Sequence, residues 1–199
     1  AGKSWPLPGV FMVLATQNPV DQEGTWPLPE AQLDRFLMKV LVDYPSKEHE
    51  RQVMQLVRAE QQAKYGVAAK TAPAPEAESL RFSQQEIASC WQEISAIHVA
   101  PIVETWIVEL VNATRQPQHI SEQLASYLAY GLSPRGTLAL ERCARAQAWL
   151  AGRDAVRPED VRFIAPAVMR HRLMLSYQAS ADGCSADDVI TMLLNAVVI

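Results

Sequence analysis

The chain has 199 residues, 49% of them hydrophobic and 20% charged, and a formal net charge of −4 at pH 7. This length allows one or two domains with a sizeable core, and the apolar stretches fall well short of the ~20 residues that cross a bilayer. The acidic balance and the scattered basic residues argue against a nucleic-acid-binding surface.

The chain contains three cysteines, Cys90, Cys143 and Cys184, which lie far apart in the sequence. No histidine or cysteine recurs at a spacing typical of zinc ligands, so we predict no metal site. An odd number of separated thiols is typical of a reducing compartment, and we therefore expect a cytoplasmic protein.

Residues 2–4 read Gly-Lys-Ser, which is the end of the pattern that binds nucleotide phosphates in P-loops. The pattern needs an upstream glycine, which is absent, and a helix directly after it. Pro6 and Pro8 exclude such a helix because proline breaks the helix interior. We expect the returning arm of a β-hairpin here instead of a phosphate loop.

A buried strand is predicted at residues 10–15, a continuous apolar run with no helical period. Thr16, Gln17 and Asn18 follow it and would project from the carboxyl end of the strand, where open α/β sheets bind their ligands. The Asn18 amide could contact a ligand there, or it could only bond the loop backbone before Pro19.

Arg35 follows a short predicted helix that begins at Glu30, and it precedes a second apolar run, residues 36–42, which predicts another buried strand. Such a junction normally lies at a domain edge, from which a guanidinium can reach a neighbouring subunit. The alternative is a surface salt bridge to Asp34 or Glu30, worth at most about 1 kcal/mol. The two predicted strands cannot form a doubly covered sheet alone, so we expect partner strands upstream of Ala1.

Helical periodicity dominates after Pro45. Each predicted helix is marked by a cap residue, a capping box or a proline in its first turn, and these helices begin at Ser46, Ser83, Pro101, Pro134, Pro158 and Ser185. A Pro-, Ala- and Glu-rich stretch at residues 67–79 reads as a flexible linker. The predicted fold is mostly α: a truncated α/β core remnant with two strands and a hairpin arm, residues 1–45, followed by an all-helical bundle, residues 46–199.

Arg135 lies in the first turn of the helix that Ser133 caps and Pro134 begins. Free N–H groups and the helix dipole favour an anion at this end, so a cation here is expected to have an anionic partner. That partner would be a bound phosphate, which we favour, or a nearby carboxylate. Gly136 would leave room for close approach.

Several other conspicuous residues have structural interpretations. We expect Trp91, Trp106 and Trp149 in the core because they lie on apolar helical stripes. Cys143 is expected to be packed and inert. The Arg-His-Arg run at residues 170–172 is expected to be a solvated helix end.

Four segments, ATQNP, EGTWPLPEAQLDRF, GLSPRGTLAL and GRDAVRPEDVRFIAPAVMRHRL, occur in this order. Together they resemble the second half of the MoxR-type AAA+ ATPases, and the resemblance covers nearly the whole chain. Trp26 stands where the family pattern has tyrosine, which is a conservative aromatic change. The resemblance implies that residues 1–45 end the AAA+ core and that residues 46–199 form its helical lid.

The resemblance also implies roles for three residues. Asn18 would be the sensor 1 residue, Arg35 the arginine finger acting in trans, and Arg135 the sensor 2 arginine that binds nucleotide phosphate. ATP and Mg²⁺ would be the cofactors of the complete protein. This chain contains neither a Walker A nor a Walker B motif, so we expect it to be inactive alone and to bind no cofactor tightly.

The function that the resemblance implies is ATP hydrolysis in a homo-oligomeric ring, with a hexamer expected. The ring would remodel a client protein or insert metal into it, with a von Willebrand factor A domain protein as a further partner. The residues alone leave two alternatives open, a non-catalytic helical protein-interaction module and a helical nucleic-acid-binding domain. Micromolar ATP binding by the isolated chain would contradict the expectation that this chain lacks a nucleotide pocket. Nucleic-acid binding that weakens steeply with salt would support the nucleic-acid alternative.

Overall fold

The computed structural model describes residues 4–17, 28–65 and 82–199. The chain divides into two compact units, one formed by Ala1–Val40 with Gln84–Ile199 and the other by Leu41–Ser83. Within the first unit, residues 34–39 contact the later helices. The assignment of residues 1–45 to an ATPase core and of residues 46–199 to a lid stays a prediction.

The first unit contains most of the regular structure. Its elements are α1 (Glu30–Leu33), α3 (Gln84–Ala96), α4 (Pro101–Arg115), the 3₁₀ helix η1 (Pro117–His119), α5 (Glu122–Tyr127), β1 (Leu128–Tyr130), α6 (Pro134–Leu150), α7 (Pro158–Met169), β2 (Met174–Leu175), α8 (Tyr177–Ala181) and α9 (Ala186–Ala196). The second unit contains α2 (Lys47–Lys64).

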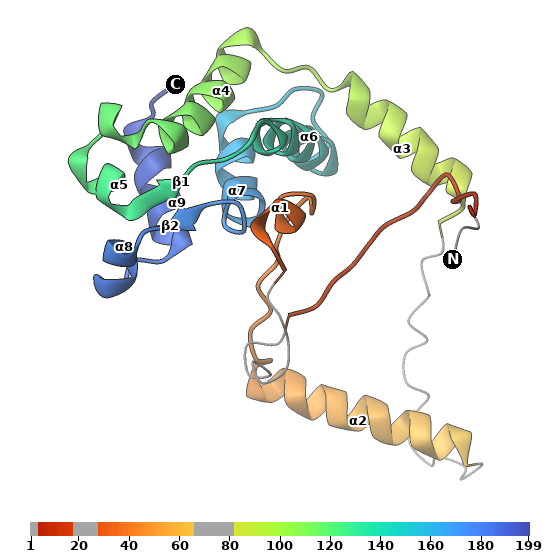
Figure 1. Ribbon diagram of the computed structural model, residues 1–199. Coiled ribbons are helices and arrows are strands. Elements are labelled where there is room, and N and C mark those ends of the chain that lie inside the picture. Colours follow the sequence, from red (N-terminus) through yellow and green to blue (C-terminus); the bar gives the residue numbers. More distant parts are fainter. Residues whose placement is uncertain (1–3, 18–27, 66–81) are drawn as a thin grey trace. The chain divides into compact units, whose positions relative to one another are not determined.

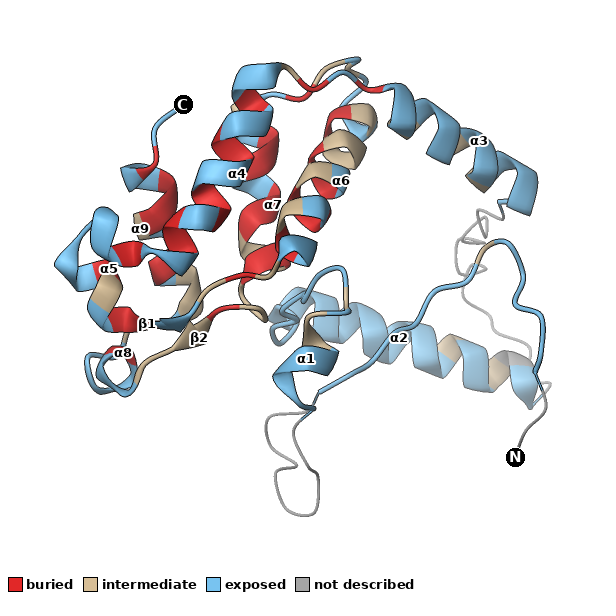
Figure 2. Ribbon diagram, turned by 45° about the horizontal axis from the view of Figure 1, so that its top comes forward, coloured by how far each residue is buried: buried red, intermediate tan, exposed pale blue. Residues whose placement is uncertain are grey.

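Four helices, α4, α6, α7 and α9, surround one hydrophobic core (Figure 1). Each turns an apolar stripe inward, as expected of amphipathic helices (Figure 2). The fully buried side chains include Leu110, Leu140, Val161, Ile190 and Leu193. The mostly helical fold predicted from the sequence is confirmed in this unit.

Sequence capping signals mark several helix starts correctly. Ser133 caps α6 by accepting a hydrogen bond from the Arg135 N–H at 3.1 Å, with Pro134 at the first helical position. Ser185 and Asp188 form the predicted capping box of α9, because each side chain accepts a hydrogen bond from the other residue's backbone N–H.

The two predicted strands are wrong for this structure. Residues 10–15 and 36–42 form no strand, and in the described residues the only sheet is the antiparallel pair β1–β2, with Leu128 opposite Leu175. A strand needs a neighbour for its backbone groups. Here the Lys39 N–H instead donates to the Ala167 carbonyl oxygen at 2.8 Å, near the end of α7. The bundle is also not entirely helical, because it contains this small sheet.

The tryptophans have three different environments. Trp106 is 2% exposed and donates from Nε1 to the Val197 carbonyl oxygen at 2.7 Å, so its predicted core position is confirmed. Trp149 is partly buried and donates to Glu93 Oε2 at 2.8 Å, which joins α6 to α3. Trp91 is 52% exposed, so its predicted core position is wrong.

The helix predicted from Ser46 is confirmed as α2, and the Ser46 Oγ accepts a hydrogen bond from the His49 N–H at 3.3 Å. Val53, Leu56 and Val57 on this helix are exposed. The predicted linker at residues 67–79 lies outside the described residues. Among the helices that the structure describes, none combines the length and the hydropathy needed to cross a bilayer.

Candidate functional site

Asn18, the first of the three predicted site residues, lies outside the described residues. The structure therefore gives no geometry for its amide. Arg35 and Arg135 are both described, and both belong to the first unit.

Arg35 lies two residues after the end of α1 and is exposed. Its backbone N–H donates to the Gln32 carbonyl oxygen at 3.1 Å, which continues the turn at the end of this short helix. The structure gives its guanidinium no ion pair and no hydrogen bond with any described residue. Its neighbour Asp34 binds other cations, so the proposed Asp34–Arg35 salt bridge is not formed.

Arg135 projects from the amino-terminal end of α6, and 57% of its side chain is exposed. Its Nη1 lies 3.3 Å from Asp34 Oδ2. Of the two anionic partners considered for this cation, the carboxylate is therefore present. The phosphate remains a prediction, and more than half of the Arg135 side chain is exposed to solvent.

Asp34 joins three segments through one carboxylate. Its Oδ2 accepts hydrogen bonds from Ser133 Oγ at 2.9 Å and from Arg135 Nη1 at 3.3 Å, both at the start of α6. Its Oδ1 accepts one from Arg172 Nε at 3.2 Å, just after α7. The segment that carries Arg35 is thus bonded directly to the helix that carries Arg135.

The side chain of Arg172 is only 3% exposed, although the sequence suggested a solvated helix end. Besides Asp34 Oδ1, its guanidinium donates to four backbone carbonyl oxygens: those of Asp34 at 3.2 Å and Leu37 at 3.1 Å, and those of Phe36 and Val168. Five acceptors satisfy a buried cation that would otherwise be strongly unfavourable.

Arg170 and His171 extend the same contact. Arg170 Nη1 donates to the Lys39 carbonyl oxygen at 3.1 Å, while its Nε and Nη2 form a bidentate pair with Asp187 at 2.9 Å each. His171 Nε2 lies 3.1 Å from the Phe36 carbonyl oxygen. We call residues 34–39 the finger segment. Residues 170–172 hold its backbone, and sequence analysis missed this role.

The run before Arg135 is fixed against the end of α4. The Leu132 N–H donates to Thr114 Oγ1 at 3.0 Å, and Arg115 Nε donates to the Leu132 carbonyl oxygen at 2.7 Å. A Cβ on Gly131 would lie 2.4 Å from the Thr114 carbonyl oxygen, so only glycine fits this approach.

Gly136 has a different role from the one expected. A Cβ built on it would lie 2.6 Å from Cδ2 of Leu132, and the residue is buried. Its missing side chain therefore leaves room for Leu132 in the core. Gly136 therefore does not provide space for a phosphate.

Burial lowers the pKa of two of these groups, His171 and Arg172. Desolvation lowers the pKa of His171 below its usual value, and the nearby Arg172 and Lys39 lower it further, against the Phe36 carbonyl and Asp34, which raise it. Burial also lowers the pKa of Arg172, an effect that Asp34 opposes. The ordinary pKa of arginine lies so far above neutral pH that Arg172 remains charged.

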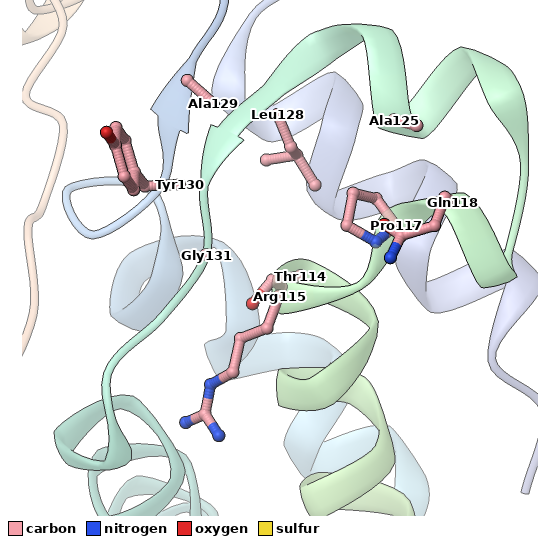
Figure 3. A pocket seen from close by; sticks show the side chains of 9 residues that line it. All are labelled: Thr114, Arg115, Pro117, Gln118, Ala125, Leu128, Ala129, Tyr130 and Gly131. Carbon is pink, nitrogen blue, oxygen red and sulfur yellow. The ribbon is translucent and has the colours of Figure 1, made fainter.

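A surface pocket of about 430 Å³ lies between the end of α4, η1, α5 and β1 (Figure 3). Arg115 and Tyr130 line it, but their side chains point away from each other. The Arg115 Nε donates to the Leu132 carbonyl oxygen, and its Nη1 lies 3.4 Å from Asn112 Oδ1. The basic group of this pocket thus serves to fix the loop before α6.

Two family models match the chain. Residues 1–38 match the ATPase family associated with various cellular activities (AAA), and residues 121–193 match the AAA lid domain. The first match contains the segment up to Arg35, and the second contains Arg135 and Arg172.

Several curated relatives carry MoxR names. The chain is 40% identical over 200 residues to Chaperone MoxR1 of Mycobacterium tuberculosis, covering 98% of this chain and 48% of the relative. It is 34% identical over 171 residues to Protein MoxR of Paracoccus denitrificans, covering 83% of this chain and 49% of the relative. The chain spans about half the length of these relatives.

A solved structure matches the fold. The crystal structure of a protein assigned as an ATPase from Cytophaga hutchinsonii superimposes with a TM-score of 0.81 at 37% sequence identity. The match covers 98% of this chain and 56% of that one.

Proposed function

Because the chain belongs to the MoxR-type AAA+ ATPase family, we propose that it supplies the phosphate-sensing and arginine-finger part of an ATP-hydrolysing ring. One observation carries the proposal: two exposed guanidinium groups, those of Arg35 and Arg135, lie on segments that Asp34 bonds together. Residues 1–45 would end the ATPase core, and residues 46–199 would form the lid.

Arg35 is assigned as the arginine finger. Transfer of a phosphoryl group needs cationic groups aimed at the charge that develops on its oxygens. The Arg35 guanidinium is exposed and has no hydrogen bond or ion pair with a described residue, so it can meet such charge. In a closed ring with head-to-tail interfaces it would meet the nucleotide of a neighbouring subunit.

Arg135 is assigned as the sensor 2 residue. A phosphate ligand fits Arg135, because its mostly exposed side chain stands at the positive end of the dipole of a 17-residue helix. ATP with Mg²⁺ would supply the phosphoanhydride that is cleaved. We do not assign Asp34 as a Mg²⁺ ligand, because three donors already bind its carboxylate.

Asn18 is assigned as the sensor 1 residue from the ATQNP segment that contains it and from the family to which the chain belongs. A short neutral amide can orient an attacking water molecule without adding charge. The complete protein would form a homo-oligomeric ring, with a hexamer as the proposed size. Its proposed work is chaperone-like remodelling of a client or metal insertion into it, with a von Willebrand factor A domain protein as a partner.

The proposal is tested by phosphate release from ATP and by nucleotide affinity in the complete protein. We expect wild-type protein to release phosphate, and Arg135→Ala to bind ATP at least about tenfold more weakly because one charge-assisted contact to phosphate is lost. Arg142→Ala is the matched control, because Arg142 is exposed on the same helix and has no recorded contact with a described residue. Wild-type protein that releases no phosphate would contradict the proposed function.

A further inference from the structure

The two arginines that donate to Asp34 differ in burial and in their number of contacts. Arg172 is buried and holds five acceptors, whereas Arg135 is 57% exposed and has a single ion pair at 3.3 Å. An exposed ion pair contributes little and exchanges readily with other partners, but removal of one partner from a buried pair is strongly destabilising. Asp34 therefore has one permanent cation, Arg172, and one exchangeable cation, Arg135.

The backbone on both sides of Arg35 is held by the permanent partner. Arg172 donates to the carbonyl oxygens of Asp34 and Phe36, the residues that flank Arg35, and His171 contacts Phe36 as well. The side chain of Arg35 remains exposed. Its backbone is thus fixed to the helical bundle while its guanidinium faces solvent.

From this arrangement we propose that Asp34 and Arg172 form a latch that positions Arg35, and that Asp34 competes with nucleotide phosphate for Arg135. Asp34 and Arg172 are positioning residues, since they act through Arg35 and Arg135. This inference rests on the proposed function, because it assigns the latch to the same ATPase site.

The latch predicts opposite effects on rate and on binding. Removal of the Asp34 charge releases the finger segment, so the catalytic rate falls because Arg35 is no longer held in place. The same change frees Arg135 from its competing carboxylate, so ATP affinity is unchanged or rises. A merely structural role would lower the rate and the affinity together.

The experiment uses the complete protein with Asp34→Asn, Arg172→Gln and the double variant, and it measures kcat and the Kd for ATP separately. We expect Asp34→Asn to lower kcat at least about tenfold while the Kd stays the same or falls by about threefold. Arg172→Gln should lower kcat similarly, and the double variant should add little because both changes open one latch. Asp154→Asn is the matched control, since Asp154 is exposed and its side chain has no recorded contact with a described residue.

A second readout needs no ATP turnover. The Lys39 N–H, which donates to Ala167, should exchange with solvent at least about tenfold faster in Asp34→Asn and in Arg172→Gln in this chain. Amides around the fully buried Leu193 should exchange as in wild type, which separates local release of the finger segment from global unfolding.

Three results would overturn the latch. One is a wild-type kcat in Asp34→Asn when Arg35→Ala is inactive, which would leave the proposed function standing. Another is a parallel loss of kcat and of ATP affinity in Asp34→Asn. The third is unchanged hydrogen exchange of the Lys39 amide in both variants. This result would overturn the latch even if wild-type protein released no phosphate and the proposed function itself failed.

Discussion

His171 places an ionisable ring against the finger segment. Its Nε2 contacts the Phe36 carbonyl oxygen, which can only accept, so this nitrogen carries the hydrogen. Its Nδ1 is buried and has no hydrogen-bond partner among the described residues. A proton added at Nδ1 would therefore be buried without an acceptor, beside the cations of Arg172 and Lys39.

This environment predicts a pH dependence of stability. The pKa of folded His171 lies below its unfolded value of about 6.5, so below that pH the unfolded chain binds a proton that the folded chain does not. The stability that neutral His171 contributes is complete above about pH 6.5 and is lost as the pH falls through the folded pKa.

We expect the urea concentration at the midpoint of unfolding to decrease in wild type as the pH is lowered from 7.5 to 5.5. In His171→Gln it should decrease less. Glutamine can still donate to the Phe36 carbonyl but binds no proton in this range. The difference between the two curves isolates His171 from the other histidines. Parallel curves would show that His171 does not titrate on unfolding.

For single residues, the sequence predicts those features that depend on neighbouring residues along the chain. Arg135 could be placed at a helix start because Ser133 and Pro134 are the cap and first-turn residues typical of one. The contact between Asp34 and Arg172 joins residues 138 positions apart, and no local pattern connects them. Arg172 therefore looked like a solvated helix end, and only the fold reveals that it is buried.

The junction between β1 and α6 determines how the element that carries Arg135 is held. Gly131 passes so close to the end of α4 that a Cβ would lie 2.4 Å from the Thr114 carbonyl oxygen and 2.7 Å from the Arg115 nitrogen. Both contacts are with backbone, which cannot move aside as a flexible side chain can.

Gly131→Ala should therefore lower the free energy of unfolding by about 1–3 kcal/mol, as overpacking does in other well-packed sites. Thermal or urea unfolding of this chain measures the loss. Gly9→Ala is the matched control, because nothing lies within 4 Å of a Cβ built at that position. Equal stability of the two variants would mean that the close approach at Gly131 does not constrain the sequence.

Helices and strands differ in how well the sequence predicted them. The helices α4, α6 and α7 begin with proline, and α6 and α9 have serine caps. Together with their apolar stripes, these local signals allowed the helix starts and core faces to be predicted. A strand exists only with a neighbour, and residues 10–15 and 36–42 pair with no strand in the described residues. Apolar composition alone could not supply that partner. The same limit applies to Trp91, which is exposed although it lies on a predicted apolar stripe.

At the scale of the whole molecule, we propose that two exposed arginines from different parts of the chain act as one functional unit. Arg35 comes from the part of the chain that matches the AAA family model, and Arg135 comes from the part that matches the lid. Asp34 bonds the two parts together. We therefore expect a shift of the lid to move the finger segment with it, which would couple the proposed phosphate contact at Arg135 to the position of Arg35.

The most direct measurement is the steady-state rate of ATP hydrolysis by the complete protein carrying Arg35→Ala, together with its Kd for ATP. We predict that kcat falls by about a thousandfold or more, as for other arginine fingers, while the Kd changes by less than about threefold and Arg142→Ala behaves as wild type. An Arg35→Ala protein that hydrolyses ATP at the wild-type rate would contradict the account.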